Sequence, residues 1–288
     1  MRETRYVIAS GTLAAIEYGD VKTADLSVVF LHGWLDNAAS FHRVMAELHQ
    51  QNPKLHLCAI DLPGHGLSSH KSLDNFYPFH DYIDDVYQFL RVLSPNKLLL
   101  VGHSLGALIA SCYSAAFPEQ VTALVQIEGY GPLAEAPQKA VERLRQGVLS
   151  RNRLRAKPSR NLSSFDEALM LRVAANQLSA DALRPIVERG VEHRHGIWQW
   201  RHDAKLKCDS LYRLSQKHAE TILDQISCFH LIILGENGFR ELKDISHLNA
   251  KNPAQIETVQ GGHHCHLEQS LEVAMRILGV VNKIETSV

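Results

Sequence analysis

Five consecutive residues, Gly102-His103-Ser104-Leu105-Gly106, have the types and spacing that could expose a nucleophilic serine. They follow an apolar run over Leu98–Val101 and precede small residues over Ala107–Ser111. A sharp strand-to-helix turn of this kind presents the hydroxyl at its tip, and glycine on both sides tolerates the tight backbone. We therefore predict that Ser104 is a nucleophile. The simpler alternative is a strand–turn–helix whose glycines serve only packing.

Three further segments carry recognisable patterns: HGWLDNAASF over 32–41, DLPGHGLSSH over 61–70 and GGHHCHLE over 261–268. Together with GHSLGA at 102–107, they resemble the α/β-hydrolase superfamily throughout the chain. The first two look most similar to its serine-hydrolase-like (kraken-type) proteins. The resemblance implies an α/β-hydrolase fold, with a mostly parallel eight-stranded sheet, helices on both faces and an inserted helical lid.

The resemblance also implies a general base near the C-terminus, because the chain order in this fold is serine, acid, histidine. His263 follows two glycines on the loop after the expected last strand, 256–259, and is our choice, with His264 second. Three histidines around Cys265 could also suggest a metal site. Zinc sites usually recruit ligands from a second element, and the sequence offers no complementary cluster. We predict neither a metal nor an organic cofactor.

The acid of the triad has two candidates. The resemblance places an aspartate after the seventh strand, but that position holds Gly238, and Glu236 lies two residues too early. The other position follows the sixth strand, where Glu128 ends an apolar run and precedes a Gly/Pro turn. A carboxylate that orients the imidazole and stabilises the imidazolium is all that this position must supply. We favour Glu128 over Glu236, with a solvated glutamate as the alternative for both.

Two backbone amides must stabilise the oxyanion of an acyl-transfer reaction. One is expected from Leu105, directly after the nucleophile, and the other from Trp34 in the His-Gly-x loop after the third strand. The Trp34 ring and His103 are our candidates for contact with substrate, although a large aromatic side chain packs in the core about as often. We interpret Asp61 and His65 as residues that fix loop geometry.

Composition agrees with an enzyme core. A chain of 288 residues with 45% hydrophobic residues can bury a substantial core. Its net charge of −1 gives no reason to expect nucleic acid or an anionic membrane surface. Five scattered cysteines favour a reducing compartment, and neither a signal peptide nor a transmembrane run is recognisable. We expect a cytoplasmic protein without stable membrane association, and a homodimer is compatible with the sequence.

The order of the expected elements completes the prediction. Strand-like runs dominate to about residue 31, after which strands alternate with helices such as 81–90, as in a parallel sheet covered on both faces. Strand signals disappear from 133 to 224. We therefore assign residues 1–132 and 225–288 to the core and residues 133–224 to a helical lid inserted after strand six.

Positive charge is concentrated in that lid, which holds 17 Lys and Arg against 11 Asp and Glu, whereas the remainder holds 13 against 20. Residues Arg151–Arg160 carry the densest part. Such a cluster could attract an anionic substrate, but a solvated helix face is the more common outcome. The segment around Trp198 and Trp200 resembles the place where such lids rejoin the core, so we expect both rings to pack there.

The residues together predict two-step acyl transfer on a small-molecule ester or thioester. Carbon–carbon bond hydrolysis and cofactor-free perhydrolysis use the same triad, so they remain open. Dehalogenation is disfavoured because the nucleophile position holds Ser104 and not an aspartate. A ligand receptor that retains the site is the alternative from another class of protein, although a pure binder needs no general base.

Overall fold

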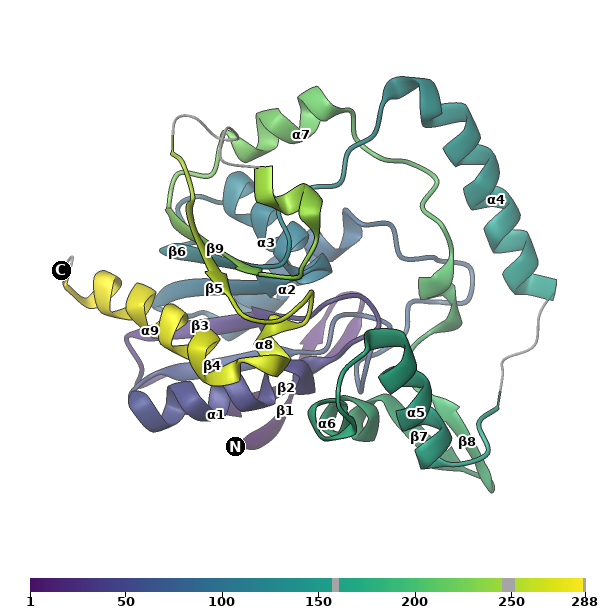
Figure 1. Cartoon of the computed structure of the whole chain (residues 1–288), viewed down its shortest axis with the longest axis horizontal. Coiled ribbons are helices and arrows are strands. Elements are labelled where there is room, and N and C mark those ends of the chain that lie inside the picture. Colours follow the sequence, from purple (N-terminus) through teal and green to yellow (C-terminus); the bar gives the residue numbers. More distant parts are fainter. Residues whose placement is uncertain (157–160, 245–251, 287–288) are drawn as a thin grey trace.

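A central sheet of eight strands runs through the protein (Figure 1). The computed structural model describes residues 1–156, 161–244 and 252–286. The strand order is β1-β2-β4-β3-β5-β6-β9-β10, and only the pairs β1–β2 and β2–β4 are antiparallel. The strands are β1 (Arg2–Ile8), β2 (Gly11–Tyr18), β3 (Leu26–Leu31), β4 (His56–Ile60), β5 (Lys97–His103), β6 (Ala123–Ile127), β9 (Phe229–Gly235) and β10 (Gln255–Val259).

The parallel strands are buried on both faces, as their unbroken apolar runs indicate. The side chains of β3 alternate between two apolar clusters. Val29 and Leu31 pack in one cluster, and Val28 and Phe30 pack in the other. Side chains with a period of two must point to opposite faces of the sheet. The sheet therefore separates two helical layers.

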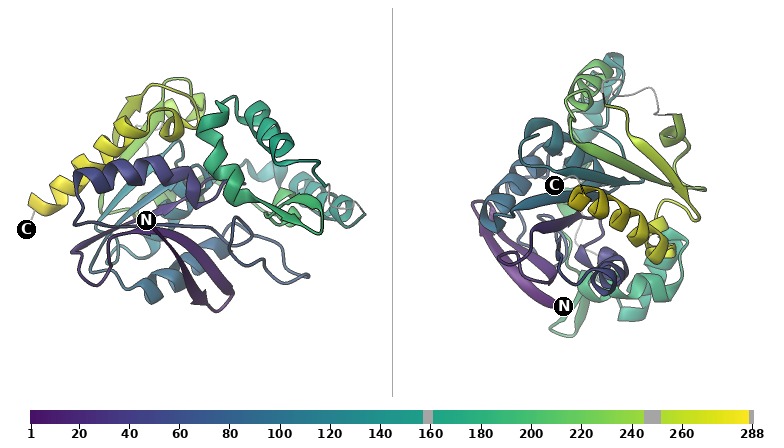
Figure 2. Two further views of the ribbon diagram at one scale, coloured as in Figure 1. Left: turned by 90° about the horizontal axis from the view of Figure 1, so that it is seen from below. Right: turned by 90° about the vertical axis from the view of Figure 1, so that its left-hand side faces the viewer.

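Helices cover both faces of the sheet (Figure 2). One face carries α2 (Asp81–Leu93), α3 (Leu105–Ala116) and α7 (Gln216–Leu223), and the other carries α1 (His42–Gln51) and α9 (Ser270–Thr286). The short helix α8 (Cys265–Glu268) lies between β10 and α9, and short 3₁₀ turns are η1 (Ala38–Phe41) and η4 (Arg240–Asp244). The predicted helix over 81–90 is confirmed as the body of α2, and the predicted fold class is confirmed.

The chain between β6 and β9 is mostly helical, as expected. It contains η2 (Pro137–Lys139), α4 (Ala140–Ala156), α5 (Phe165–Asn176), α6 (Ala180–Gly190), η3 (Ala204–Lys207) and α7. Figure 1 shows α4 at the periphery of the molecule, while α5 and α6 lie together beside the carboxyl ends of the sheet strands. Helix α7 packs against α3 of the core. We call residues 133–224 the inserted segment.

A two-stranded hairpin within the inserted segment was not expected from the sequence. Strands β7 (Val191–Arg194) and β8 (Ile197–Trp200) pair antiparallel across a turn at His195 and Gly196, which both have positive φ. The ring of Trp198 contacts Phe165 edge-on. The sequence did not predict the hairpin because its two four-residue strands, Val-Glu-His-Arg and Ile-Trp-Gln-Trp, do not alternate strictly between apolar and polar residues. No helix among residues 1–156, 161–244 and 252–286 has the length and apolar character needed to cross a membrane.

Candidate active site

Ser104 occupies a strained turn between β5 and α3. Its φ of 48° and ψ of −115° lie in a region that L-residues rarely adopt. A Cβ on Gly102 would overlap the Gly106 carbonyl, and one on Gly106 would overlap the Leu31 carbonyl. Glycine is therefore required on both sides of Ser104. Such strain is retained where it positions a functional group, here a hydroxyl that lines a pocket.

His263 reaches Ser104 from the loop between β10 and α8. Its Nε2 lies 3.0 Å from the Ser104 Oγ. The loop turns at Gly261, whose φ is +106°, and the amide of Gly262 donates a hydrogen bond of 2.7 Å to Glu268. Because the base of an acyl-transfer site must contact the nucleophile, His263 occupies the position expected of it.

Glu128 completes a hydrogen-bonded chain behind His263. The Nδ1 of His263 donates to Glu128 Oε2 at 3.2 Å, which leaves Nε2 as the acceptor facing Ser104. The carboxylate is 1% exposed, and its oxygens also accept the amides of Gly235 at 2.7 Å and Phe239 at 3.1 Å. These partners satisfy a buried charge that would otherwise be costly. Glu236, the other candidate, is exposed and no interaction joins it to His263 in the described part of the chain.

The backbone of the loop after β3 passes beside Ser104. A Cβ on Gly33 would lie 3.4 Å from the Ser104 Cβ, so the peptide that leads into Trp34 is adjacent to the nucleophile. Leu105 opens α3, where first-turn amides have no partner within the helix. Both expected oxyanion donors thus lie next to Ser104. The Trp34 indole Nε1 donates to the Leu206 carbonyl at 2.9 Å, which ties this loop to η3.

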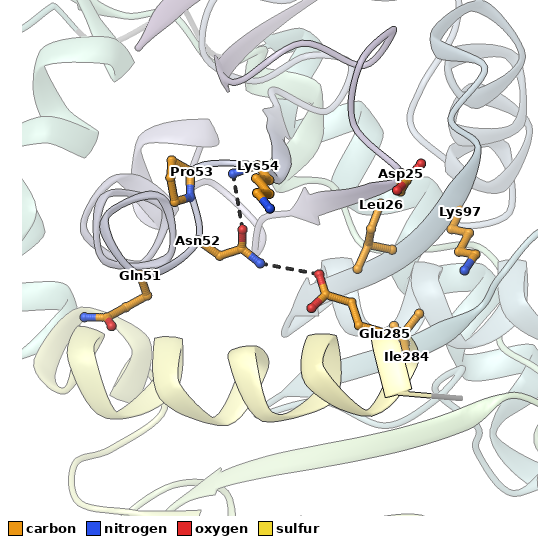
Figure 3. Close-up of a pocket in the computed structure, with 9 residues that line it drawn as sticks. All are labelled: Asp25, Leu26, Gln51, Asn52, Pro53, Lys54, Lys97, Ile284 and Glu285. Atoms are coloured by element: carbon orange, nitrogen blue, oxygen red, sulfur yellow. Dashed lines mark hydrogen bonds between the residues drawn. The ribbon is translucent and has the colours of Figure 1, made fainter. Parts of the chain in front are cut away.

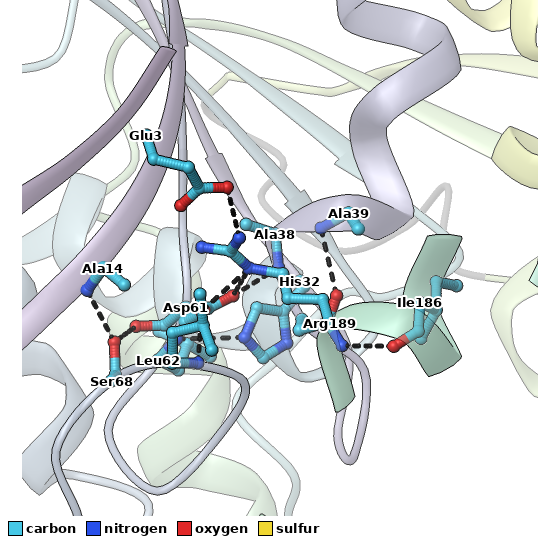
Figure 4. Close-up of polar contacts among 12 residues, drawn as sticks. Glu3, Ala14, His32, Ala38, Ala39, Asp61, Leu62, Ser68, Ile186 and Arg189 are labelled. Atoms are coloured by element: carbon cyan, nitrogen blue, oxygen red, sulfur yellow. Dashed lines mark hydrogen bonds and ion pairs between the residues drawn. The ribbon is translucent and has the colours of Figure 1, made fainter. Parts of the chain in front are cut away.

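A buried ion pair joins the inserted segment to Asp61, which lies in the loop after β4 (Figure 4). Arg189 of α6 donates its Nε to both Asp61 oxygens at 2.9 Å and an Nη to Glu3 at 2.5 Å. Asp61 also accepts the amide of Ala38 at 2.8 Å. The structural role predicted for Asp61 fits these contacts, because its carboxylate fixes the backbone just after the Trp34 loop.

A pocket of about 420 Å³ opens at Ser104. The inserted segment and the loop before α2 supply most of its wall. The lining residues are Trp34, Tyr77, Phe79, His80, Tyr82, Ser104, Leu105, Leu108, Pro132, Leu133, Arg143, Leu206, Lys207, Cys208, Asp209, Ser210, Tyr212, Arg213 and Leu214. A small organic molecule fits a concave, largely apolar site of this size. Except for Trp34, Ser104 and Leu105, sequence reasoning missed these residues, because no spacing along the chain marks them.

His103 lies behind the site, where it does not line this pocket. Its Nε2 donates to the His263 carbonyl at 2.8 Å, and its ring contacts that of His266 with centroids 4.1 Å apart. Burial lowers the pKa of His103 well below its usual value, so the ring is neutral. The structure thus places His103 under the loop that carries His263, in place of the substrate contact we expected.

The second choice for the base, His264, faces away from Ser104. Its Nε2 lies 2.9 Å from the Asn176 amide nitrogen and 3.8 Å from an Asp36 oxygen. Burial lowers its pKa. Within the described ranges, no group of three His, Cys, Asp or Glu side chains could hold a metal ion. The absence of a cofactor stays a prediction.

The basic run Arg151–Arg160 does not line the pocket in its described part. Arg151 lies over the Phe76 ring at 4.0 Å, and Arg153 is 4.0 Å from an Asp209 oxygen. Residues 157–160 lie outside the described residues.

A separate pocket of about 590 Å³ lies at the opposite end of the sheet, between the starts of β3 and β5 and the end of α9 (Figure 3). None of the candidate site residues lines it.

The fold and the site together define a class of protein. Comparison of this chain with known proteins identifies the family. Residues 27–213 match the family model of the α/β hydrolase fold. The chain therefore belongs to the α/β-hydrolase family. It is 30% identical over 267 residues to a probable serine hydrolase of Drosophila melanogaster, which covers 87% of this chain and 79% of the relative. A serine hydrolase-like protein of Danio rerio is 27% identical over 83% of this chain and 76% of its own. These relatives support the predicted serine-hydrolase-like subgroup.

Solved structures agree with this membership. A hypothetical protein of Pseudomonas aeruginosa is 30% identical, covers 98% of this chain and all of its own, and superposes with a TM-score of 0.88. The thioesterase domain from the curacin biosynthetic pathway has a TM-score of 0.84 over 97% of this chain and 99% of its own. At 22% identity, that second similarity shows the fold alone.

Proposed function

We propose that this protein is a serine hydrolase that cleaves a carboxylic ester or thioester through an acyl-enzyme. The observation that carries the proposal is the hydrogen-bonded chain from Ser104 through His263 to Glu128 at the base of a pocket. A nucleophile in contact with a base, which a third group orients, is the arrangement that activates a serine at neutral pH.

The proposed reaction begins when His263 Nε2 takes the proton of Ser104 as its Oγ attacks the carbonyl carbon. The amides of Leu105 and Trp34 stabilise the oxyanion, and Glu128 stabilises the imidazolium through Nδ1. The imidazolium then protonates the leaving oxygen or sulfur, and the acyl group remains on Ser104. Water, deprotonated by His263, attacks the acyl-enzyme, and the returned proton releases the acid and restores the serine.

Esters and thioesters are the substrates that this geometry supports best. The pocket wall is mostly apolar and aromatic, which suits an acyl chain beside Ser104. A thioesterase domain among the structural neighbours shows that this fold accommodates thioester chemistry in another protein. We further propose a reducing compartment such as the cytoplasm. The thiols of Cys112 and Cys265 are packed in the core, where burial raises their pKa to about 12.

The proposal is tested with the Ser104→Ala variant and a fluorophosphonate probe. The wild-type protein should hydrolyse 4-nitrophenyl butyrate and take up one fluorophosphonate group, located on Ser104 by peptide mass spectrometry. Ser104→Ala should lose both properties while its melting temperature stays close to that of the wild type. Ser72→Ala, which alters an exposed serine, is the matched control and should retain both. Turnover that survives in Ser104→Ala, or labelling at another serine, would contradict the assignment.

A further inference from the structure

Positive charge lines the pocket wall that faces Ser104. Arg143 comes from α4, Lys207 ends η3, and Arg213 lies in the segment between η3 and α7. Asp209 is the one carboxylate among the residues that line this pocket. An apolar acyl chain forms no hydrogen bond or ion pair with a guanidinium group. The hydrolase chemistry proposed above therefore gives no reason for cations in this wall.

Backbone contacts fix the two arginines beside each other. The amide of Glu135 donates to the Leu214 carbonyl at 2.9 Å, and Ala134 and Leu214 form a parallel bridge. The Glu135 carboxylate then accepts the Nε of Arg143 at 2.5 Å. This ion pair is made by the Nε of Arg143, so it orients the side chain without involving the terminal amino groups of the guanidinium. The position of Arg213 follows from the same bridge, because it precedes Leu214 directly.

Arg213 has no carboxylate within 4 Å in the part of the chain that the structure describes. It is half-buried, and burial together with the charge of Arg143 lowers its pKa. Two guanidinium groups that share a partly desolvated wall repel each other. Glu135 and Asp209 offset part of this repulsion. Since arginine stays protonated, a bound anion would offset more of it.

We propose that Arg213 and Arg143 bind a carboxylate of the substrate, so that the natural substrate is an ester or thioester that carries a carboxylate away from the scissile bond. The inference rests on the proposed function. A guanidinium presents parallel N–H donors that match the two oxygens of a carboxylate. The apolar part of the wall, near Leu108 and Tyr82, then holds the carbon chain between the carboxylate and Ser104.

The experiment compares charged and neutral substrates of equal shape. The 4-nitrophenyl monoesters of adipate and suberate place a carboxylate on the acyl side, and their methyl esters are the neutral counterparts. A second pair, 4-carboxyphenyl butyrate and its methyl ester, places it on the leaving-group side. The measured quantity is the ratio of kcat/KM for the charged over the neutral member. In the wild type at least one pair should give a ratio above one.

Arg213→Gln should lower that ratio about ten- to a hundredfold, the range expected when a hydrogen bond between charged groups is lost. Arg213→Lys should restore part of it, because charge returns without the paired donors. The matched control is Arg145→Gln, an exposed arginine of the same helix as Arg143 that does not line the pocket, and its ratio should match the wild type.

Two outcomes would overturn the inference. One is a wild-type ratio at or below one for every pair, while the neutral esters are still hydrolysed in a Ser104-dependent way. The other is an equal drop in Arg213→Gln and Arg145→Gln, which would indicate a general surface field and not a binding contact. Loss of Ser104 dependence on the neutral esters would instead contradict the proposed function itself, so the two failures are distinguishable.

Discussion

The carboxylate of Glu128 occupies the space that a side chain on Gly238 would need. A Cβ on Gly238 would overlap both carboxylate oxygens. Position 238 is where the family resemblance led us to look for an acid after the seventh strand. The glutamate after β6 therefore depends on the glycine after β9, because only glycine at position 238 leaves room for the carboxylate that reaches His263.

Gly238→Ala should therefore lower activity by pushing Glu128 away from His263. We expect kcat/KM to fall at least tenfold. The largest loss we expect is about ten-thousandfold, which is the loss that follows when a triad acid stops orienting its histidine. Steady-state hydrolysis of 4-nitrophenyl butyrate measures the effect. Gly279→Ala is the matched control, since a Cβ there meets nothing within 4 Å, and its activity should equal that of the wild type. Normal activity in Gly238→Ala would contradict the steric relationship.

The same relationship predicts that the acid can be moved. Gly238→Asp alone should be inactive, because two carboxylates cannot share the site. Adding Glu128→Gly removes the clash and suits the φ of 49° at position 128, which glycine adopts without strain. The double variant should be at least tenfold more active than Glu128→Gly alone. Equal activities would show that an aspartate at 238 cannot orient His263.

Direct substitution of the two candidate acids separates them. Glu128→Gln keeps the shape of the side chain but presents an amide to His263, so kcat should fall on the order of ten-thousandfold. Glu236→Gln changes an exposed side chain and should alter kcat less than twofold. The pH profile of kcat/KM for both variants accompanies the rates. The opposite ranking would move the acid to the loop after β9.

The sequence predicted the parts of the site that depend on local chain geometry. Gly102 is required by a contact within the turn itself, with the Gly106 carbonyl, and His263 follows a glycine pair just after β10. Glu128 was preferred for the same kind of reason, because a strand end on the carboxyl edge of the sheet faces Ser104. Each of these predictions requires only that one strand be recognised and that the edge of the sheet at which it ends be known.

The sequence could not predict contacts that join distant segments. The amide of Phe239 holds Glu128, and its ring lies 4.1 Å from that of His263, yet nothing in the sequence marks a phenylalanine for this position. Arg143 and Arg213 are 70 positions apart, and a bridge between Ala134 and Leu214 brings their two segments together. The expected substrate contact of His103 depended on the direction of its side chain, and packing against the rings of His263, His264 and His266 sets that direction.

Arg189 is expected to stabilise both the fold and the loop after β3 that carries Trp34. Arg189→Met would leave the fully buried Asp61 without its cation, which typically costs about 3–5 kcal/mol of unfolding free energy. Because Asp61 also holds the Ala38 amide, kcat should fall together with stability. Urea unfolding and esterase rates measure the two effects.

Arg194→Met, which alters an exposed arginine of β7, is the control for that substitution and should change neither quantity. The double variant Arg189→Met with Asp61→Asn should be less destabilised than the sum of the single variants, since it removes the uncompensated charge. Additive losses would mean that the two side chains act independently, against the contacts in Figure 4.

Buried histidines should make the protein less stable as the pH falls below about 6.5. Burial lowers the pKa values of His65, His103 and His266 well below the usual range and that of His202 to about 3. In the unfolded chain these rings bind protons near pH 6.5, whereas in the folded protein they stay neutral. The unfolded state therefore gains protons as the pH falls, so the unfolding free energy decreases, by up to about 1.4 kcal/mol per pH unit for each ring.

Urea unfolding at pH 7.5, 6.5 and 5.5 tests this sign and its source. The wild type should lose stability progressively over that range. His266→Phe removes one of the rings and places an apolar side chain beside Phe41, whose ring centroid lies 5.3 Å from that of His266. The slope of unfolding free energy against pH below 6.5 should then be smaller by about one proton, or about 1.4 kcal/mol per unit. An unchanged slope would mean that His266 takes up its proton in the folded protein, contrary to its complete burial.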